Sequence, residues 1–189
     1  MKKIVLIAVA AFISLAASAQ NLKFAYVDFT EVIQLMPEMD SARVQIEVAS
    51  KEAQETYQAM VEEFQGKYQQ FEQKQASWTP AIRDSKAAEL QQIESRIQEF
   101  QQAIQQDLQA LQNQLQAPIY AKAQKAVEDL AKAKGVAGVF EKASLLYIDP
   151  AQMIDLTAEA RKSLGIPEGR TLEQLQQELA AKAQAAQGM

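Results

Sequence analysis

The stretch LQQIESRIQEFQQAIQQDLQALQNQLQAPI, residues 90–119, decides the fold. Its apolar side chains recur in steps of three and four residues, and most residues between them are Gln, Glu and Ala. That spacing keeps the apolar side chains on one side of an α-helix, because a helix has 3.6 residues per turn. We call this set the apolar row; it comprises Leu90, Ile93, Ile97, Phe100, Ile104, Leu108, Leu111, Leu115 and Ile119.

A long helix with one narrow apolar row needs a partner helix of similar length. The sequence predicts that partner just upstream, from about Asp40 to Ser77. Pro80 suits the first turn of the return helix, which we expect over about 81–134. The two helices predict an antiparallel coiled-coil hairpin, an arm over 38–134 with its tip at 75–81, projecting into solvent. The partner helix has its own row of apolar and aromatic side chains: Ala49, Ala53, Tyr57, Met60, Phe64, Tyr68 and Phe71.

The segments on either side of the arm predict a small β-sheet base. The β-branched and aromatic run at 22–29 is typical of a strand. Two further strands are expected at 136–140 and 144–148, joined by a tight turn. Thr30 is expected to cap a short helix over 31–36, and an amphipathic helix is expected over 151–164. The predicted fold class is therefore α+β, mostly α.

The predicted base, 22–36 with 135–165, is too small to be stable alone, and the chain has no Cys to form a disulfide. We therefore expect it to associate with copies of itself through exposed strands, in a number that these residues do not fix. The tail over 166–189 is expected to be mobile, with Thr171 and Gln174 as the capping box of a weak last helix. The strand residues expected to associate are Phe24, Tyr26, Val27, Val139, Phe140, Leu146 and Ile148.

The first nineteen residues have the three parts of a secretory signal peptide. Basic residues at 2–3 precede an apolar run at 4–15 and the small residues Ala17-Ser18-Ala19. The run is too short for a permanent membrane anchor, so we expect cleavage near Ala19 and a soluble mature protein outside the cytoplasm. Losing Lys2 and Lys3 leaves 17 basic against 24 acidic residues, a net charge of −7.

The composition argues against most catalytic and ligand-binding classes. The chain contains no Cys and no His, which removes thiol nucleophiles, the commonest general base and the commonest metal ligands. It has no glycine-rich phosphate-binding motif. The negative charge makes the chain a poor nucleic-acid binder. We therefore expect no enzyme, no cofactor, no metal and no nucleic-acid partner.

Several short motifs, in this order and spacing, resemble the OmpH/Skp family of periplasmic chaperones over about residues 22–164. The resemblance implies a homotrimer whose bases share a small β-barrel, with three arms around a cavity that holds unfolded outer-membrane proteins without ATP. Two features differ from the best-known members: this chain is acidic, so lipopolysaccharide binding is not implied, and its tail has no counterpart. The motifs are Phe24-Ala25-Tyr26-Val27-Asp28, Pro37-Glu38, Gly135-Val136, Leu146-Tyr147-Ile148-Asp149 and Asp155-Leu156-Thr157.

The expected mechanism is confinement by many weak contacts with the arms, through an uncharged inner face such as Gln98, Gln101, Gln102, Gln105 and Gln109. The aromatic stripe of the partner helix either packs the two helices together or contacts the client; it consists of Tyr57, Phe64, Tyr68 and Phe71. Trp78 either closes the turn or contacts a client or a membrane, although nothing further supports membrane contact. The alternative function is a structural coiled-coil spacer or adaptor in the cell envelope. The candidate client contacts are Met60, Phe64, Tyr68, Phe71 and Trp78.

Overall fold

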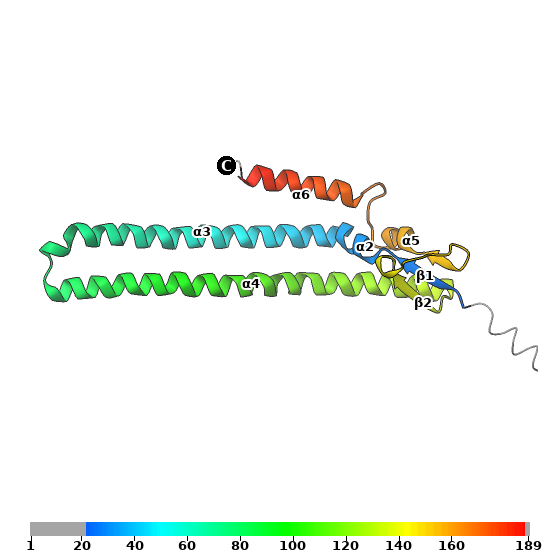
Figure 1. Ribbon diagram of the computed structural model, residues 1–189, viewed down its shortest axis with the longest axis horizontal. Coiled ribbons are helices and arrows are strands. Elements are labelled where there is room, and N and C mark those ends of the chain that lie inside the picture. The colour runs from blue at the N-terminus through cyan, green and yellow to red at the C-terminus, as the bar shows by residue number, and fades with distance from the viewer. Residues whose placement is uncertain (1–21, 188–189) are drawn as a thin grey trace, which may run out of the picture. The chain divides into compact units, whose positions relative to one another are not determined.

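The computed structural model describes residues 22–187, and it is mostly helical with one small sheet (Figure 1). The predicted signal peptide at 1–19 lies outside these residues. The elements are β1 (Phe24–Val27), α2 (Phe29–Leu35), α3 (Pro37–Lys74), the 3-10 turn η1 (Gln75–Ser77), α4 (Pro80–Lys134), β2 (Gly138–Glu141), the 3-10 turn η2 (Lys142–Ser144), β3 (Met153–Asp155), α5 (Thr157–Ser163) and α6 (Leu172–Gln187).

The described chain divides into two compact units. The helical unit spans 40–118, and the base unit combines 22–39 with 119–187. The base unit is larger than the predicted base, because it includes the last part of α4, from Ile119 onward. Pro118, inside α4, is therefore the last residue of the helical unit.

The sheet has β1 at its centre, in the order β2-β1-β3, and both neighbours run parallel to β1. Phe24 pairs with Gly138 on one side and with Met153 on the other. The ladder continues on the second side, where the amide of Leu156 donates to the carbonyl of Tyr26 at 2.9 Å. The carboxyl ends of three strands from distant parts of the chain therefore meet at one edge.

The predicted strand at 144–148 and its tight turn are wrong, and the helix predicted over 151–164 is wrong in its first half, since only Thr157–Ser163 is helical. Residues 142–144 form η2, Leu146 and Tyr147 are exposed, and Met153–Asp155 is a strand. The apolar spacing of this short segment fits a helix and a strand equally well. The second edge of β1 has backbone groups that need hydrogen-bond partners, and Met153–Asp155 provides them as a parallel strand. This pairing decides that the segment forms a strand and not a helix.

The helix ends are set by local chemistry that the sequence predicted only in part. Asp28 caps α2 instead of Thr30, accepting a hydrogen bond from the amide of Glu31 at 3.0 Å. Pro37 begins α3 directly after α2 ends. Gly135 ends α4 with φ of 63°, as expected for a left-handed cap, and the amide of Val136 donates to the carbonyl of Ala131.

The core of the base unit lies where β1, α2 and α5 meet the end of α4. Leu35, Met36 and Leu156 are fully buried. Alternate residues of β1 face this core, which is the two-residue period of a strand. The other buried apolar residues of the unit are Ala25, Val27, Val32, Ile33, Met39, Ile119, Ala123, Val127, Ala160, Leu164, Ile166 and Leu175.

The tail forms the expected last helix, and that helix is attached to the base unit. The predicted capping box is present: the amide of Thr171 donates to Gln174 Oε1 at 3.1 Å, and the amide of Gln174 donates to Thr171 Oγ1 at 3.2 Å. Leu175 is only 4% exposed, and α6 contacts α2. The tail after Gly165 is therefore helical from Leu172 and packed at its start.

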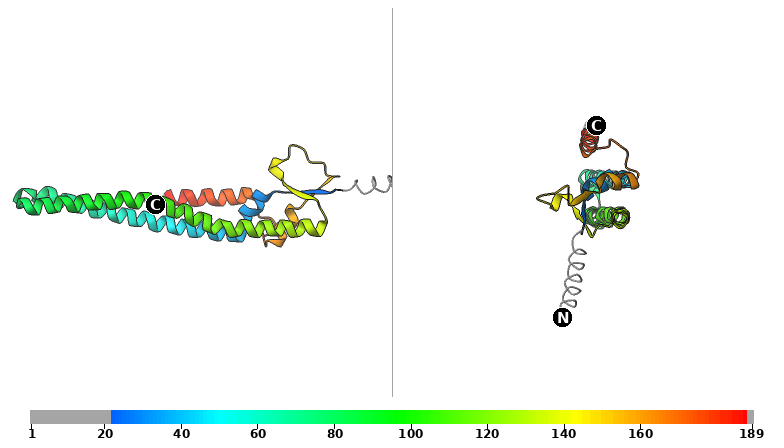
Figure 2. Two further views of the ribbon diagram at one scale, coloured as in Figure 1. Left: turned by 90° about the horizontal axis from the view of Figure 1, so that it is seen from below. Right: turned by 90° about the vertical axis from the view of Figure 1, so that its right-hand side faces the viewer.

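In the helical unit, α3 and α4 lie side by side in each view (Figures 1 and 2). Ion pairs join Lys67 to Glu89 and Glu63 to Arg96, so lower residue numbers on α3 meet higher ones on α4. Every residue of the apolar row is buried or half-buried, and Ile93 is the most enclosed residue of the row at 2% exposure. Within the helical unit, each of the two helices packs against the other, which covers one side of its apolar row.

Glu89 is the most strongly perturbed carboxylate of the helical unit. Hydrogen bonds from Lys67 and then Lys86 lower the pKa of Glu89 to about 2. A carboxylate whose pKa falls on folding stabilises the folded state above the pKa of its unfolded form, near 4.5. That stabilisation is lost as the pH falls toward 2.

Replacing Leu156 with Ala is expected to lower the free energy of unfolding by about 2–5 kcal/mol, because it removes a fully buried side chain and leaves a cavity. Urea denaturation followed by circular dichroism, at one fixed protein concentration, measures this. Leu179, which is 41% exposed, provides the matched Leu→Ala control and is expected to lose far less. Equal losses in the two variants would contradict the assigned core.

Replacing Glu89 with Gln is expected to lower the melting temperature at pH 6 and to have progressively less effect as the pH falls from 4.5 to 2. Melting curves of both proteins across that range measure the difference. Glu94→Gln is the control, because Glu94 lies on the same helix and forms no ion pair within residues 22–187. A wild-type advantage that persists unchanged at pH 2 would rule out this role for the Glu89 carboxylate.

Candidate functional site

The aromatic stripe of α3 packs partly on its own neighbours. Phe64 stacks on Tyr68 with ring centroids 6.0 Å apart, and Phe71 meets Trp78 edge-on at 5.7 Å. Met60, Phe64 and Phe71 are half-buried, whereas Tyr68 is 45% exposed. Of the predicted contact residues, Tyr68 is therefore the one with the most surface open to a client. Trp78 is half-buried and packs at the turn between the helices.

A groove of about 420 Å³ is lined by residues of both α3 and α4. On α3, its lining residues come before Met60 in the sequence. It forms because α3 supplies small residues such as Ala53 opposite the large side chains of Phe100, Ile104 and Leu108. These three remain only half-buried as a result. The groove contains no charged residue; its other lining residues are Ser50, Gln54, Tyr57, Gln101 and Gln105.

A second groove, of about 580 Å³, is lined mainly by charged residues. It contains the Glu63–Arg96 ion pair, and Glu89 contributes to its wall. The two grooves share no residue. The helical unit therefore presents one uncharged and one charged groove, a division that the apolar periodicity alone did not reveal.

The predicted association residues are placed unequally in the base unit. Phe24, Tyr26 and Val27 lie in the central strand, and Val27 is only 3% exposed, so it serves the core of its own chain. Burial, followed by the nearby carboxylate of Asp155, raises the pKa of the Tyr26 phenol. Val139 and Phe140 lie in β2, and Phe140 is 44% exposed with its ring 5.8 Å from that of Phe24.

Leu146 and Ile148 lie outside the strands, in the segment between η2 and β3. Leu146 is fully exposed and Tyr147 is 80% exposed. Within residues 22–187, β2 and β3 each pair only with β1, which leaves their outer edges unpaired. The base unit thus carries two open strand edges and exposed apolar side chains, the usual features of an association surface.

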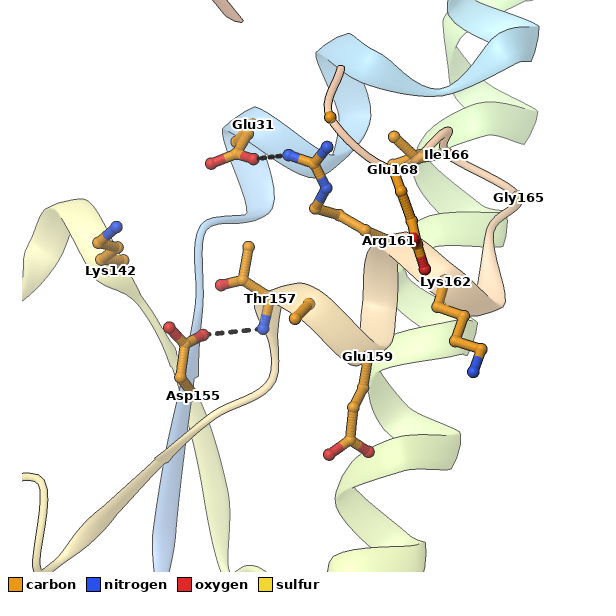
Figure 3. Close-up of a pocket in the computed structure, with 12 residues that line it drawn as sticks. Glu31, Lys142, Asp155, Thr157, Glu159, Arg161, Lys162, Gly165, Ile166 and Glu168 are labelled. Atoms are coloured by element: carbon orange, nitrogen blue, oxygen red, sulfur yellow. Dashed lines mark hydrogen bonds and ion pairs between the residues drawn. The ribbon is translucent and has the colours of Figure 1, made fainter. Parts of the chain in front are cut away.

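A polar pocket of about 830 Å³ opens beside β3 and α5 (Figure 3). Arg161 points toward Glu31 of α2 and binds its carboxylate, and it also donates to the carbonyl of Arg170. Asp155 accepts a hydrogen bond from the amide of Thr157 at 2.8 Å. These contacts connect α2, α5 and the segment before α6, so the polar groups mainly hold the base unit together.

This polar connection was not predicted from the sequence. Glu31 and Arg161 are far apart in the chain, and nothing in their local sequence distinguishes them from other charged residues. Among the described residues, no cluster of three or more His, Cys, Asp or Glu side chains could hold a metal ion. No helix within 22–187 has the length and apolar character needed to span a membrane.

Comparison with known proteins identifies the family. The model of the OmpH family, described as outer membrane protein (OmpH-like), matches residues 23–164. No curated protein matches the chain significantly. The matched segment includes all of β1, α3, α4, β2 and β3, and it ends before the tail helix α6. The chain therefore belongs to the OmpH-like family, whose members are periplasmic chaperones of outer-membrane proteins.

Proposed function

We propose that this protein is an ATP-independent periplasmic holdase that encloses unfolded outer-membrane proteins between helical arms and prevents their aggregation. The observation that carries the proposal is the incomplete burial along α3 and α4. Phe100, Ile104 and Leu108 stay only half-buried because each helix has a single neighbour in the helical unit. Apolar surface of this kind can bind an unfolded chain at many points.

Each of these contacts is weak alone. A client held at several points on one molecule dissociates slowly, because each rebinding event is intramolecular. Release then requires no nucleotide: a client that folds or inserts into a membrane buries its own apolar surface and loses its affinity for the arms. Family membership supports this type of client.

We further propose that the base unit joins three copies of the chain and that the hairpin of α3 and α4 projects from the assembly. The open edges of β2 and β3, with the exposed Phe140 and Leu146, support association through the base. A small unit without disulfides gains stability by covering such edges. Several arms around one space would also multiply the weak contacts available to a client.

The mature protein is expected to prevent aggregation of a urea-unfolded β-barrel membrane protein on dilution, with no nucleotide added; light scattering measures this. Deleting 58–71 together with 86–99 shortens both helices by two heptads in register. The shortened protein should hold small clients and lose large ones. Aggregation that proceeds unchanged at a several-fold excess of wild-type protein would refute the holdase. Client-independent binding of the shortened protein to one fixed envelope partner would instead favour a spacer.

Sedimentation equilibrium of the mature protein is expected to give the mass of three chains. Phe140→Glu and Leu146→Glu together should shift the mass toward one chain, because they place charge on the proposed contact surface. Val44→Glu with Val48→Glu is the control, since both valines are about half exposed on α3, outside the base unit. A single-chain mass for the wild-type protein would contradict the proposed trimer.

A further inference from the structure

The two grooves of the helical unit lie on opposite sides of the apolar row. Gln101 and Gln105 each follow a residue of the row by one position, whereas Arg96 and Glu99 each precede one. One position corresponds to a rotation of about 100° around a helix axis. The side chains that follow the row and those that precede it therefore lie on different flanks of α4.

The same division holds on α3. Ser50 and Gln54 follow Ala49 and Ala53 and line the uncharged groove, whereas Glu63 precedes Phe64 and pairs with Arg96. In two antiparallel helices, the positions that follow the facing rows lie on the same flank of the pair. The pair of helices thus has a charged flank, bridged by ion pairs, and an uncharged one.

Glutamine dominates the uncharged flank. Along α4, the residue that follows each row position from Leu90 to Leu115 is Gln, except for Glu94. Along α3, the corresponding residues are uncharged except for Glu72. We call this side the glutamine flank; its Gln residues are Gln54, Gln58, Gln65, Gln69, Gln91, Gln98, Gln101, Gln105, Gln109, Gln112 and Gln116.

Resting on the proposed function, we infer that the glutamine flank is the client-binding face, and that its groove at Gln54, Gln101 and Gln105 takes an extended, uncharged segment of unfolded chain. The side-chain amides of these three residues make no hydrogen bond within residues 22–187. Each amide offers both donors and an acceptor, which is what an exposed peptide backbone requires. Phe100, Ile104 and Leu108 form the apolar floor beneath them.

The composition of the two flanks favours this assignment. A strand of a membrane β-barrel alternates apolar residues with polar ones. Its apolar side chains would contact the groove floor, while its backbone would contact the amides above. On the charged flank, Glu63, Arg96 and Glu89 already pair with charged groups of the same chain. A neutral segment bound there would remove these groups from water without providing a charged partner.

The experiment compares two double variants that change the charge equally on the same helix. Gln101→Glu with Gln105→Glu alters the glutamine flank, and Gln92→Glu with Gln114→Glu alters the charged flank. Binding of a fluorescent, urea-unfolded β-barrel membrane protein is measured after dilution. The first variant is expected to bind about tenfold more weakly than wild type, and the second to bind within about twofold. Circular dichroism and sedimentation confirm folding and mass.

Equal weakening in both variants, or weakening confined to the charged-flank variant, would overturn the inference. A change of mass in the glutamine-flank variant with unchanged client binding would overturn it too, because a second copy would then cover this flank. Failure of the proposed function has a different signature: the wild-type protein itself would not bind the probe.

A photo-crosslinking residue at position 105 or 114 provides a test that does not depend on the charge variants. The inference predicts crosslinks to the client mainly from position 105; equal yields from both positions would contradict it.

Discussion

The incomplete burial of the apolar row is the constraint on which the rest of the account depends. A helix with one narrow apolar stripe cannot enter a globular core, so α4 needs a neighbour that matches it in length. One neighbour encloses Ile93 almost completely but leaves Ile104 and Leu108 only half-buried, since α3 offers small residues such as Ala53 opposite them. The same packing therefore stabilises the helix pair and leaves apolar surface available for binding.

The base unit is stabilised differently from the helical unit, by a core between a small sheet and the helices that cover it. Three short parallel strands, contributed by segments far apart in sequence, are covered by α2, α5 and the end of α4. Leu156 and Leu35 fill the space between these elements. Arg161 connects α2 to α5 and to the segment before α6, which brings the tail helix into the unit. The edges left open are consistent with the proposed association of several chains.

The sequence predicted the features that depend on long periodic patterns or on strong local signals. The apolar row extends over many turns, so the helix expected over about 81–134 agrees closely with α4. Asp28 illustrates a limit, because Asp28 and Thr30 are both good caps and only the packing of α2 decides between them. The segment from Leu145 to Ile148 illustrates another limit, since four apolar residues in a row resemble a strand although they pair with none of the three strands.

The composition of the proposed binding surface was predictable from the sequence, but its position was less so. Glutamine-rich helices indicated an uncharged inner face, yet Gln102 does not belong to the flank that Gln101 and Gln105 share. The groove itself depends on which α3 residues face Ile104, and that register is seen only in contacts between distant residues, such as the Lys67–Glu89 ion pair. Tyr68 remains the most exposed of the aromatic residues first expected to contact a client.

Hydrogen–deuterium exchange of the protein with and without a bound, unfolded β-barrel client shows whether the half-buried rows of α3 and α4 take up the client. The account predicts that the client slows amide exchange in α3 and α4 within 40–118, where the half-buried rows lie. It predicts little change around Val32 and Leu156 in the core of the base unit. Slowed exchange confined to 22–39 and 119–187, with α3 and α4 unaffected within 40–118, would contradict it.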